Sequence, residues 1–252
     1  MKDMMKIGII IQARTDSKRF PNKVLELINS KSVLWHVINR CKKTPYHVIV
    51  STTNRIIDDS IVDIAKKSNV SYFRGSSDDV LDRFYQTALH FSLDLIIRIT
   101  ADCPLIDPDE LVKVVEPIQN NGFDYAGLDE KTYPDGFDSE AFTFKTLEKT
   151  WKNSKLKSER EHVTPYIKNP INDFKITYVA FKNNYSNLRL SIDHFEDLIL
   201  IRTLFNELHE NQNFHIDDIL QIFNQKPELL KINQQFKRNE GYEKSLKDDK
   251  SI

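Results

Sequence analysis

The stretch IGIIIQARTDSKRFPNK, residues 7–23, determines the fold expected for this chain. It opens with an uninterrupted apolar run, Ile7–Ile11, of the length typical of a parallel strand that is buried on both faces. A polar loop with several basic residues follows, and Val33–Cys41 then carries apolar residues at helical spacing. This order of strand, long loop and helix places the loop at the carboxyl end of a central strand, where α/β proteins bind their ligands.

Strand and helix patterns continue to alternate beyond this opening. Strands are predicted at residues 47–51, 70–73 and 93–99, with helices at 57–67 and 80–91 between them. Such alternation is typical of a parallel sheet that is covered by helices on both faces. The loops that begin at Gln12, Thr52, Arg74 and Thr100 should therefore converge at one edge of the sheet.

The second half of the chain is less regular. The patterns predict helices at 108–118, 144–151, 159–167 and 196–208, strands at 124–126, 174–181 and 188–192, and a turn-like segment at 129–138. One principal domain, residues 1–225, accounts for these elements. Residues 226–252 form a polar tail, which is expected to be frayed or disordered because it has few apolar residues.

The composition excludes several classes of protein. With 36 basic and 37 acidic residues, the chain lacks the broad positive charge of a nucleic-acid binder. Its only cysteines, Cys41 and Cys103, are too few for a disulfide framework or a zinc site. No apolar run approaches the roughly 20 residues that a membrane span needs. These observations favour a cytoplasmic protein without a nucleic-acid or membrane partner.

The loop of residues 12–23 is the first candidate for chemistry. It places Arg14, Lys18, Arg19 and Lys23 close together in sequence, next to small residues whose backbone amides could face an anion. Guanidinium and ammonium groups can share the oxygens of a triphosphate. A basic loop that only faces solvent is the alternative, since exposed charge costs little.

The same loop resembles the opening loop of the cytidylyltransferases that activate acidic sugars. The family motif Arg-x-x-Ser-x-Arg-x-Pro-x-Lys is matched by Arg14, Ser17, Arg19, Pro21 and Lys23. A glutamine before Ala-Arg is closest to the spore-coat polysaccharide branch. Blocks at residues 74–83, 98–106 and 158–166 resemble this branch too, and they follow in the same order.

The resemblance covers most of residues 5–210 and implies a fold and a donor. The fold would be a single Rossmann-like, three-layer α/β domain of the nucleotide-diphospho-sugar transferase type. A small β/α insertion, residues 124–180, would serve the acceptor or a dimer contact. The donor would be CTP, and the residues assigned to it are Gln12, Ala13, Arg14, Ser17, Arg19, Lys23 and Arg83.

The resemblance also implies catalytic residues and a metal. Arg14, Lys23 and Asp102 would be catalytic, and Asp102 and Asp193 would hold Mg²⁺, an ion that prefers hard oxygen ligands. Other interpretations stay open, because Asp102 could cap a turn and Arg83 could be an exposed helix residue. Asp193 could cap the next helix, since His194-Phe195 replaces the usual Thr-Pro of the family.

The sequence gives weaker evidence for the residues that would bind the acceptor. The family places two polar patches near the acceptor or the dimer contact, and the candidates in them are Tyr133, Asp135, Glu140, Arg160 and His162. A turn at Asp135-Gly136 and a capping box at residues 158–161 explain some of them equally well. Asp107-Pro108-Asp109 has the Asp-x-Asp form of glycosyltransferases, but it lies where a helix begins, so it is predicted to be a cap.

The function implied is the transfer of CMP from CTP to an acidic or phosphorylated sugar-like acceptor, with release of pyrophosphate, for surface polysaccharide synthesis by a homodimer. A glycosyltransferase that uses a preformed nucleotide sugar is one alternative. A nucleotide-binding protein without catalysis is another, because a shared fold does not fix an activity.

Overall fold

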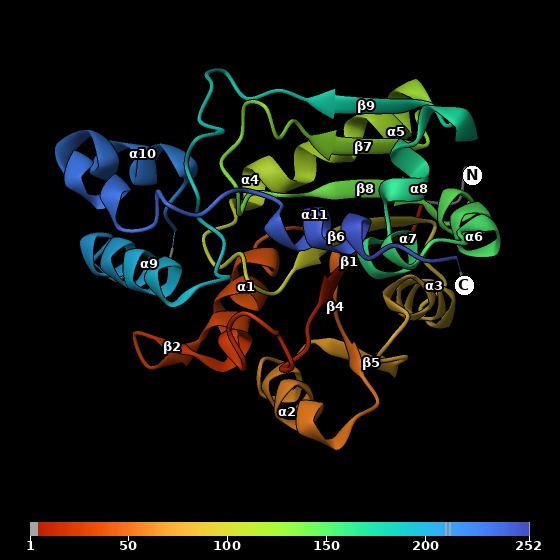
Figure 1. Ribbon diagram of the computed structural model, residues 1–252, viewed down its shortest axis with the longest axis horizontal. Helices are drawn as coiled ribbons and strands as arrows, with labels where there is room; N and C mark the ends of the chain where they lie inside the picture. Colours follow the sequence, from red (N-terminus) through yellow and green to blue (C-terminus); the bar gives the residue numbers. More distant parts are fainter. Residues whose placement is uncertain (1–4, 210, 212, 252) are drawn as a thin grey trace.

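Seven strands form one sheet in the order β5-β4-β1-β6-β8-β7-β9 (Figure 1). The computed structural model describes residues 5–209, 211 and 213–251. All strand pairs are parallel except the two that β8 makes with β6 and β7. The strands are β1 (Ile7–Gln12), β4 (His47–Thr53), β5 (Ser71–Gly75), β6 (Leu95–Thr100), β7 (Tyr125–Leu128), β8 (Glu140–Thr143) and β9 (Ile176–Val179).

Helices cover both faces of this sheet, so the predicted α/β fold with a mostly parallel sheet is confirmed. Along β1, Ile9 and Ile11 pack on one side and Ile10 packs on the other, as the pleat of a strand buried on both faces requires. The helices on the first side are α1 (Val33–Cys41), α2 (Asp59–Lys67), α4 (Pro108–Leu111), α5 (Glu116–Asn121), α9 (Phe195–Glu207) and α10 (Ile216–Gln225). Those on the second side are α3 (Val80–His90), α6 (Phe144–Asn153), α7 (Lys157–His162) and α8 (Pro165–Lys168).

The carboxyl ends of the central strands meet at one edge. Gln12, the last residue of β1, lies beside Ser51 of β4 and Thr100 of β6. The backbone N–H of Ala13 donates to the carbonyl of Ser51 at 3.0 Å, and the N–H of Ala101 donates to the carbonyl of Gln12 at 3.1 Å. The loops that follow β1, β4 and β6 therefore leave the sheet together, as the alternating pattern predicted.

The structure differs from the predicted elements in several places, and helix α10 is one element that the patterns did not predict. Strand β8 was missed because its four residues follow a polar turn and give too short a pattern, yet it inserts between β6 and β7. The strand predicted at 188–192 is wrong, since this segment makes only an isolated bridge from Arg189 to Asp135. Its backbone is hydrogen-bonded to Asp135 and, through the N–H of Ile192, to the carbonyl of Asp102, rather than along a strand.

The polar tail, expected to be frayed or disordered, carries the 3₁₀ segment η5 (Pro227–Lys231) and helix α11 (Glu240–Lys247). Figure 1 shows α11 lying in front of β6 and beside α7. The Oγ and the N–H of Ser158 both donate to the carboxylate of Asp249, at 2.6 and 3.0 Å. Leu229 of η5 packs into the hydrophobic core, whereas α11 is held largely by polar contacts, for which apolar periodicity gives no signal.

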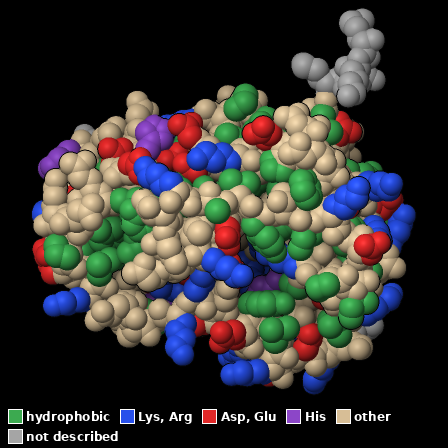
Figure 2. Space-filling model, turned by 90° about the horizontal axis from the view of Figure 1, so that it is seen from above, with side chains coloured by type: hydrophobic (Ala, Val, Ile, Leu, Met, Phe, Trp, Pro, Cys, Tyr) green, Lys and Arg blue, Asp and Glu red, His purple; other side chains and the backbone are tan. Residues whose placement is uncertain are grey.

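Two further findings concern the surface. Figure 2 shows acidic and basic side chains interspersed on the face that it presents, without a continuous basic area. Among the described residues, no helix combines the length and the apolar character that crossing a membrane requires.

Candidate active site

A cavity of about 630 Å³ opens where the loops after β1 and β6 meet α7 and α11. Its volume lies within the range of about 300 to 1,000 Å³ that is typical of small-molecule sites. All seven residues assigned to the nucleotide line it, together with Asp102, Asp193, Asp135 and His162. The structure therefore brings together the predicted donor and metal residues, which come from four separate parts of the sequence.

Lys23 joins the two predicted metal ligands. Its Nζ donates to Oδ2 of Asp102 at 2.5 Å and to Oδ1 of Asp193 at 2.8 Å. The loop turns back at Asn22, which has a left-handed φ of 60° and donates its N–H to the carbonyl of Thr15 at 2.8 Å. Burial alone would lower the pKa of Lys23, but Asp102 and Asp193 raise it, so the amine stays charged.

The two carboxylates fit a divalent cation. One oxygen of Asp102 and one of Asp193 already converge on a single positive charge, the Lys23 ammonium. Burial would raise the pKa of both acids, but Lys23 lowers both, and Arg19 lowers that of Asp193 further, so both stay ionised. Ionised carboxylates are the ligands that Mg²⁺ prefers.

The alternative that Asp193 caps helix α9 is not supported. The backbone N–H groups of Asp193 and His194 both donate to Oδ2 of Asp197, at 2.9 Å each. Asp197 therefore caps the helix, and the Asp193 carboxylate is available to pair with cations. Arg19 lies 2.6 Å from Oδ1 of Asp193, and Arg189 lies 3.2 Å from Oδ2.

Buried Asp58 fixes the backbone of the loop of residues 12–23. Its Oδ1 accepts hydrogen bonds from the N–H and the hydroxyl of Thr15, at 2.8 and 2.7 Å, and its Oδ2 accepts one from Thr53. Arg14, the next residue towards β1, makes only long ion pairs, 3.5 Å to Asp16 and 3.6 Å to Glu161. The loop backbone is thus fixed while the Arg14 guanidinium keeps capacity for another anion.

Arg83 is not the exposed helix residue that was one of its interpretations. It is 1% exposed, and one terminal nitrogen donates to the carbonyl of Ser76. Its Nε has no hydrogen-bond partner among the described residues. Burial, with the nearby charge of Arg14, lowers the pKa of Arg83 to about 10, so the side chain is still a cation at neutral pH.

The acceptor candidates separate into two groups. Asp135 and His162 line the cavity, but Tyr133, Glu140 and Arg160 do not. The Tyr133 hydroxyl donates to Glu110 at 2.6 Å, and Arg160 is paired with Asp79. Glu140 is enclosed by Arg98, Lys168, Tyr125 and Thr164. These three side chains hold elements of the fold together.

The Asp107, Asp109 and His215 side chains could hold a metal by distance alone, since one ligand atom from each lies within 4.8 Å of the others. However, Asp107 already accepts the N–H of Asp109 at 2.9 Å and the N–H of Ile216 at 2.8 Å. It thereby caps α4 and the start of α10 together, as predicted from its position. The group also lies outside the lining of the cavity described above.

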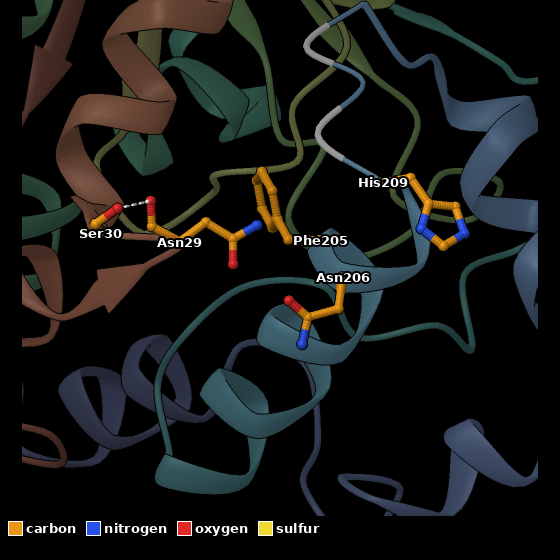
Figure 3. A pocket seen from close by; sticks show the side chains of 5 residues that line it. All are labelled: Asn29, Ser30, Phe205, Asn206 and His209. Atoms are coloured by element: carbon orange, nitrogen blue, oxygen red, sulfur yellow. Dashed lines mark hydrogen bonds between the residues drawn. The ribbon is translucent and has the colours of Figure 1, made fainter.

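A second hollow, of about 440 Å³, lies near the C-terminal end of α9 (Figure 3). Asn29, Ser30, Phe205, Asn206 and His209 line it. Figure 3 shows these side chains spread around the hollow without a common centre. Among the described residues, this lining contains no acidic or basic cluster that could hold a triphosphate or a metal.

Comparison with known proteins agrees with this geometry. A model of the family described as cytidylyltransferase matches residues 8–238. This chain belongs to the cytidylyltransferase family. The predicted recognition is thereby confirmed, and the chain is a CTP-dependent nucleotidyltransferase.

Several relatives of this cytidylyltransferase cover nearly the whole chain. An uncharacterized protein of Methanocaldococcus jannaschii is 41% identical, over 91% of this chain and 95% of its own. The spore coat polysaccharide biosynthesis protein SpsF of Bacillus subtilis is 27% identical, over 89% of this chain and 97% of its own. A solved cytidylyltransferase of Leptospira borgpetersenii is 33% identical, with a TM-score of 0.87, and covers 93% of this chain and 100% of its own.

The sequence interpretation of this cytidylyltransferase missed two features of the cavity, Arg98 and α11, and one residue that contacts its lining, Arg189. Arg98 lines the cavity and donates from Nε to Oε1 of Gln12 at 3.2 Å, which orients that amide. Its position two residues before Thr100 on β6, and so on the same face, was the available signal. Arg189 was hidden in a predicted strand, and α11 was hidden in the polar tail.

Proposed function

We propose that this cytidylyltransferase transfers CMP from CTP to an acidic or phosphorylated sugar-like acceptor, with release of pyrophosphate, in the synthesis of a surface polysaccharide. The observation that carries the proposal is the convergence of Asp102 and Asp193 on Lys23, beside the arginines of the same loop. This arrangement puts cations next to a paired-carboxylate site, as a triphosphate with a bound metal requires.

The reaction would need little covalent chemistry from the protein. An acceptor oxygen attacks the α-phosphorus of CTP, and the bond from this phosphorus to the leaving pyrophosphate breaks. Arg14, Arg19 and Lys23 would bind the phosphates and neutralise the charge that develops on the leaving group. Asp102 and Asp193 would hold Mg²⁺, which when bound supplies further charge neutralisation at the phosphoryl oxygens. The chain's main contribution is thus positioning and electrostatics.

An acceptor that is already ionised suits this site. His162 is the one histidine lining the cavity among the described residues, and burial lowers its pKa to about 4. At neutral pH it is therefore uncharged, and its Nε2 lies 2.9 Å from the Ser245 hydroxyl. A carboxylate or phosphate acceptor needs no general base, whereas a sugar hydroxyl would need one.

The names of relatives support an acidic acceptor. A 3-deoxy-manno-octulosonate cytidylyltransferase of Hydrogenovibrio crunogenus is 32% identical over 48% of this chain and 50% of its own. A synthetase for CMP-2-keto-3-deoxy-manno-octonic acid, solved with CTP, shares the fold at 16% identity and a TM-score of 0.61. Both names contain CTP or a cytidylyl group and an acidic sugar, which is the pair of substrates proposed for this chain.

Pyrophosphate release tests the proposal. The protein is incubated with Mg²⁺, each of the four common nucleoside triphosphates, and a panel of acidic and phosphorylated acceptors. CTP should be the donor that gives acceptor-dependent release. Asp102→Asn should lower turnover by at least about a hundredfold, because a metal ligand and a charge are lost together. Asp109→Asn, at a side chain that is 79% exposed and outside the cavity, is the matched control.

Other results would favour the other interpretations. Transfer from a preformed nucleotide sugar without pyrophosphate would indicate a glycosyltransferase. Binding of CTP without any product would indicate a nucleotide-binding protein.

The remaining expectations belong to the same proposal. We propose a cytoplasmic homodimer, with residues 1–225 as the nucleotidyltransferase domain and 124–180 as its acceptor or dimer subregion. Buried free thiols at Cys41 and Cys103 are consistent with a reducing compartment. Light scattering coupled to gel filtration would measure the oligomeric state, and a monomer across the working concentrations would contradict the homodimer.

A further inference from the structure

Helix α11 forms one wall of the cavity. Gly241, Lys244, Ser245 and Asp248 all line it. These positions are spaced by three or four residues, so they share one face of the helix and its C-terminal end. Because these residues line the cavity from the start of α11 to its C-terminal end, the helix is placed to touch a bound ligand along its length.

Contacts at both ends and in the middle fix this helix in place. Before it, Arg238 is paired with Asp138 and donates to the carbonyl of Tyr133 at 3.0 Å. Within it, the Ser245 hydroxyl lies 2.9 Å from Nε2 of His162, and the ring of Tyr242 packs edge-on against the His162 ring at 5.0 Å. After it, Asp249 accepts the hydrogen bonds from Ser158 described above. The wall is therefore attached to α7.

The helix also lies beyond the residues that the family model matches. The family model ends at residue 238, and α11 begins at Glu240. The donor-side cations Arg14, Arg19 and Lys23 all lie inside the matched part. The relatives of this chain carry names that point to different products, a spore coat polysaccharide in one and 3-deoxy-manno-octulosonate in another. An element beyond the matched residues is where acceptor choice can vary while the donor half stays the same.

Two lysines at this wall have no anionic partner. Lys244 of α11 and Lys157 of α7 both line the cavity. Neither side chain forms an ion pair with any acidic group in the described part of the chain, whereas Arg19 and Lys23 are paired with the metal-site carboxylates. The cavity therefore contains cations that neither the fold nor the metal site uses.

We infer that α11 and the start of α7 form the acceptor subsite, in which Lys244 and Lys157 bind the anionic group of the acceptor, a carboxylate or a phosphate. The inference rests on the proposed function. Ammonium groups bind either anion as compact point charges, so the experiment must distinguish the two sources.

The test compares two lysines of the same helix. Lys244 lines the cavity, and Lys247 is an exposed residue of α11 that does not. Acceptor KM is measured by pyrophosphate release with 3-deoxy-manno-octulosonate as the carboxylate probe and ribitol 5-phosphate as the phosphate probe. Lys244→Met should raise the acceptor KM about tenfold, the effect expected from losing one charge-assisted contact. Lys244→Arg should stay within about threefold of the original value, because the charge is kept.

Calorimetric titration with CTP separates the two halves of the cavity and serves as the folding control. Lys244→Met should change the CTP Kd by less than about twofold, and Lys247→Met should change neither constant. An unchanged acceptor KM in Lys244→Met, an equal loss of CTP affinity, or the same KM rise in Lys247→Met would each overturn the inference alone. If the unsubstituted protein releases no pyrophosphate with either probe while it still binds CTP, the proposed function fails for both acceptor classes, and the inference fails with it.

Discussion

Replacing Gly136 with alanine should destabilise the protein and disturb the proposed metal site. Gly136 has a φ of +100°, and a Cβ there would lie 2.5 Å from the carbonyl carbon of Leu190 and 2.7 Å from the nitrogen of Ser191. Ordinary contact begins at 3.4 Å, and both neighbours are backbone atoms, so one segment must move. Hydrogen bonds between Asp135 and the 188–190 backbone hold the two segments together, at 2.9 and 2.7 Å.

The cost can be estimated from these contacts. Strain at positive φ contributes about 1 kcal/mol, and the overlap contributes about 2 kcal/mol or more, for a total of about 3 kcal/mol. For a chain of this size, that loss lowers Tm by about 6 to 12 °C. Because the displaced segment leads directly to Asp193, turnover should fall as well.

Gly122→Ala is the matched control for this substitution. Gly122 also has a positive φ, +67°, but a Cβ there would meet nothing within 4 Å. Only the backbone preference is then lost, about 1 kcal/mol, which lowers Tm by about 2 to 4 °C with turnover unchanged. Thermal unfolding followed by circular dichroism measures both variants. Equal Tm losses would refute the argument that Gly136 is required by close backbone contact.

Three further substitutions and one control test the electrostatics of the cavity and of its surroundings. Lys23→Ala should lower the turnover of pyrophosphate release by orders of magnitude with folding retained, and near-normal release would contradict its assigned role. Arg189→Met should lower the free energy of unfolding in urea by about 3 to 5 kcal/mol, because it leaves the fully buried Asp197 carboxylate without its cation. Arg202→Met removes a partly exposed ion pair with Glu26 and a hydrogen bond to the carbonyl of Leu27, and it should cost only about 1 kcal/mol, so a similar loss in both variants would exclude this explanation. In the unfolded chain His162 becomes protonated below about pH 6.5, whereas in the folded chain its pKa is about 4. Lowering the pH from 6.5 to 4 should therefore destabilise the original protein by up to about 2 kcal/mol more than it destabilises His162→Gln. If the free energy of unfolding changes with pH in the same way in the original protein and in His162→Gln, this role of His162 is contradicted.

The sequence predicts that the proposed donor residues lie together, because their positions depend on local structure. The apolar run at Ile7–Ile11 defines a central strand, and the loop behind it necessarily starts at the carboxyl edge of the sheet. Asp102 is predictable for the same reason, since it follows β6. These residues depend on nearby secondary structure, which periodicity reveals.

The acceptor half depends on long-range polar contacts, which periodicity does not reveal. Tyr133 and Glu140 were candidates because they are polar residues near a predicted turn. In the structure both are buried: Tyr133 is hydrogen-bonded to Glu110, and Glu140 is paired with Arg98 and Lys168. A buried polar network cannot be distinguished from a binding patch when only residue types are known. Helix α11 was missed because polar residues hold it in place. Ser245 and Asp249 are hydrogen-bonded to residues of α7, and no sequence pattern predicts these contacts.

The position of Lys23 between two carboxylates has a consequence for its chemical reactivity. An amine attacks acylating reagents only in its neutral form. Asp102 and Asp193 keep Lys23 protonated, and only 8% of this residue is exposed. Lys18, five residues earlier in the same loop, is exposed to solvent. Labelling reagents should therefore modify Lys18 readily and leave Lys23 untouched, and any condition that makes Lys23 reactive would reveal that its two ion pairs have opened.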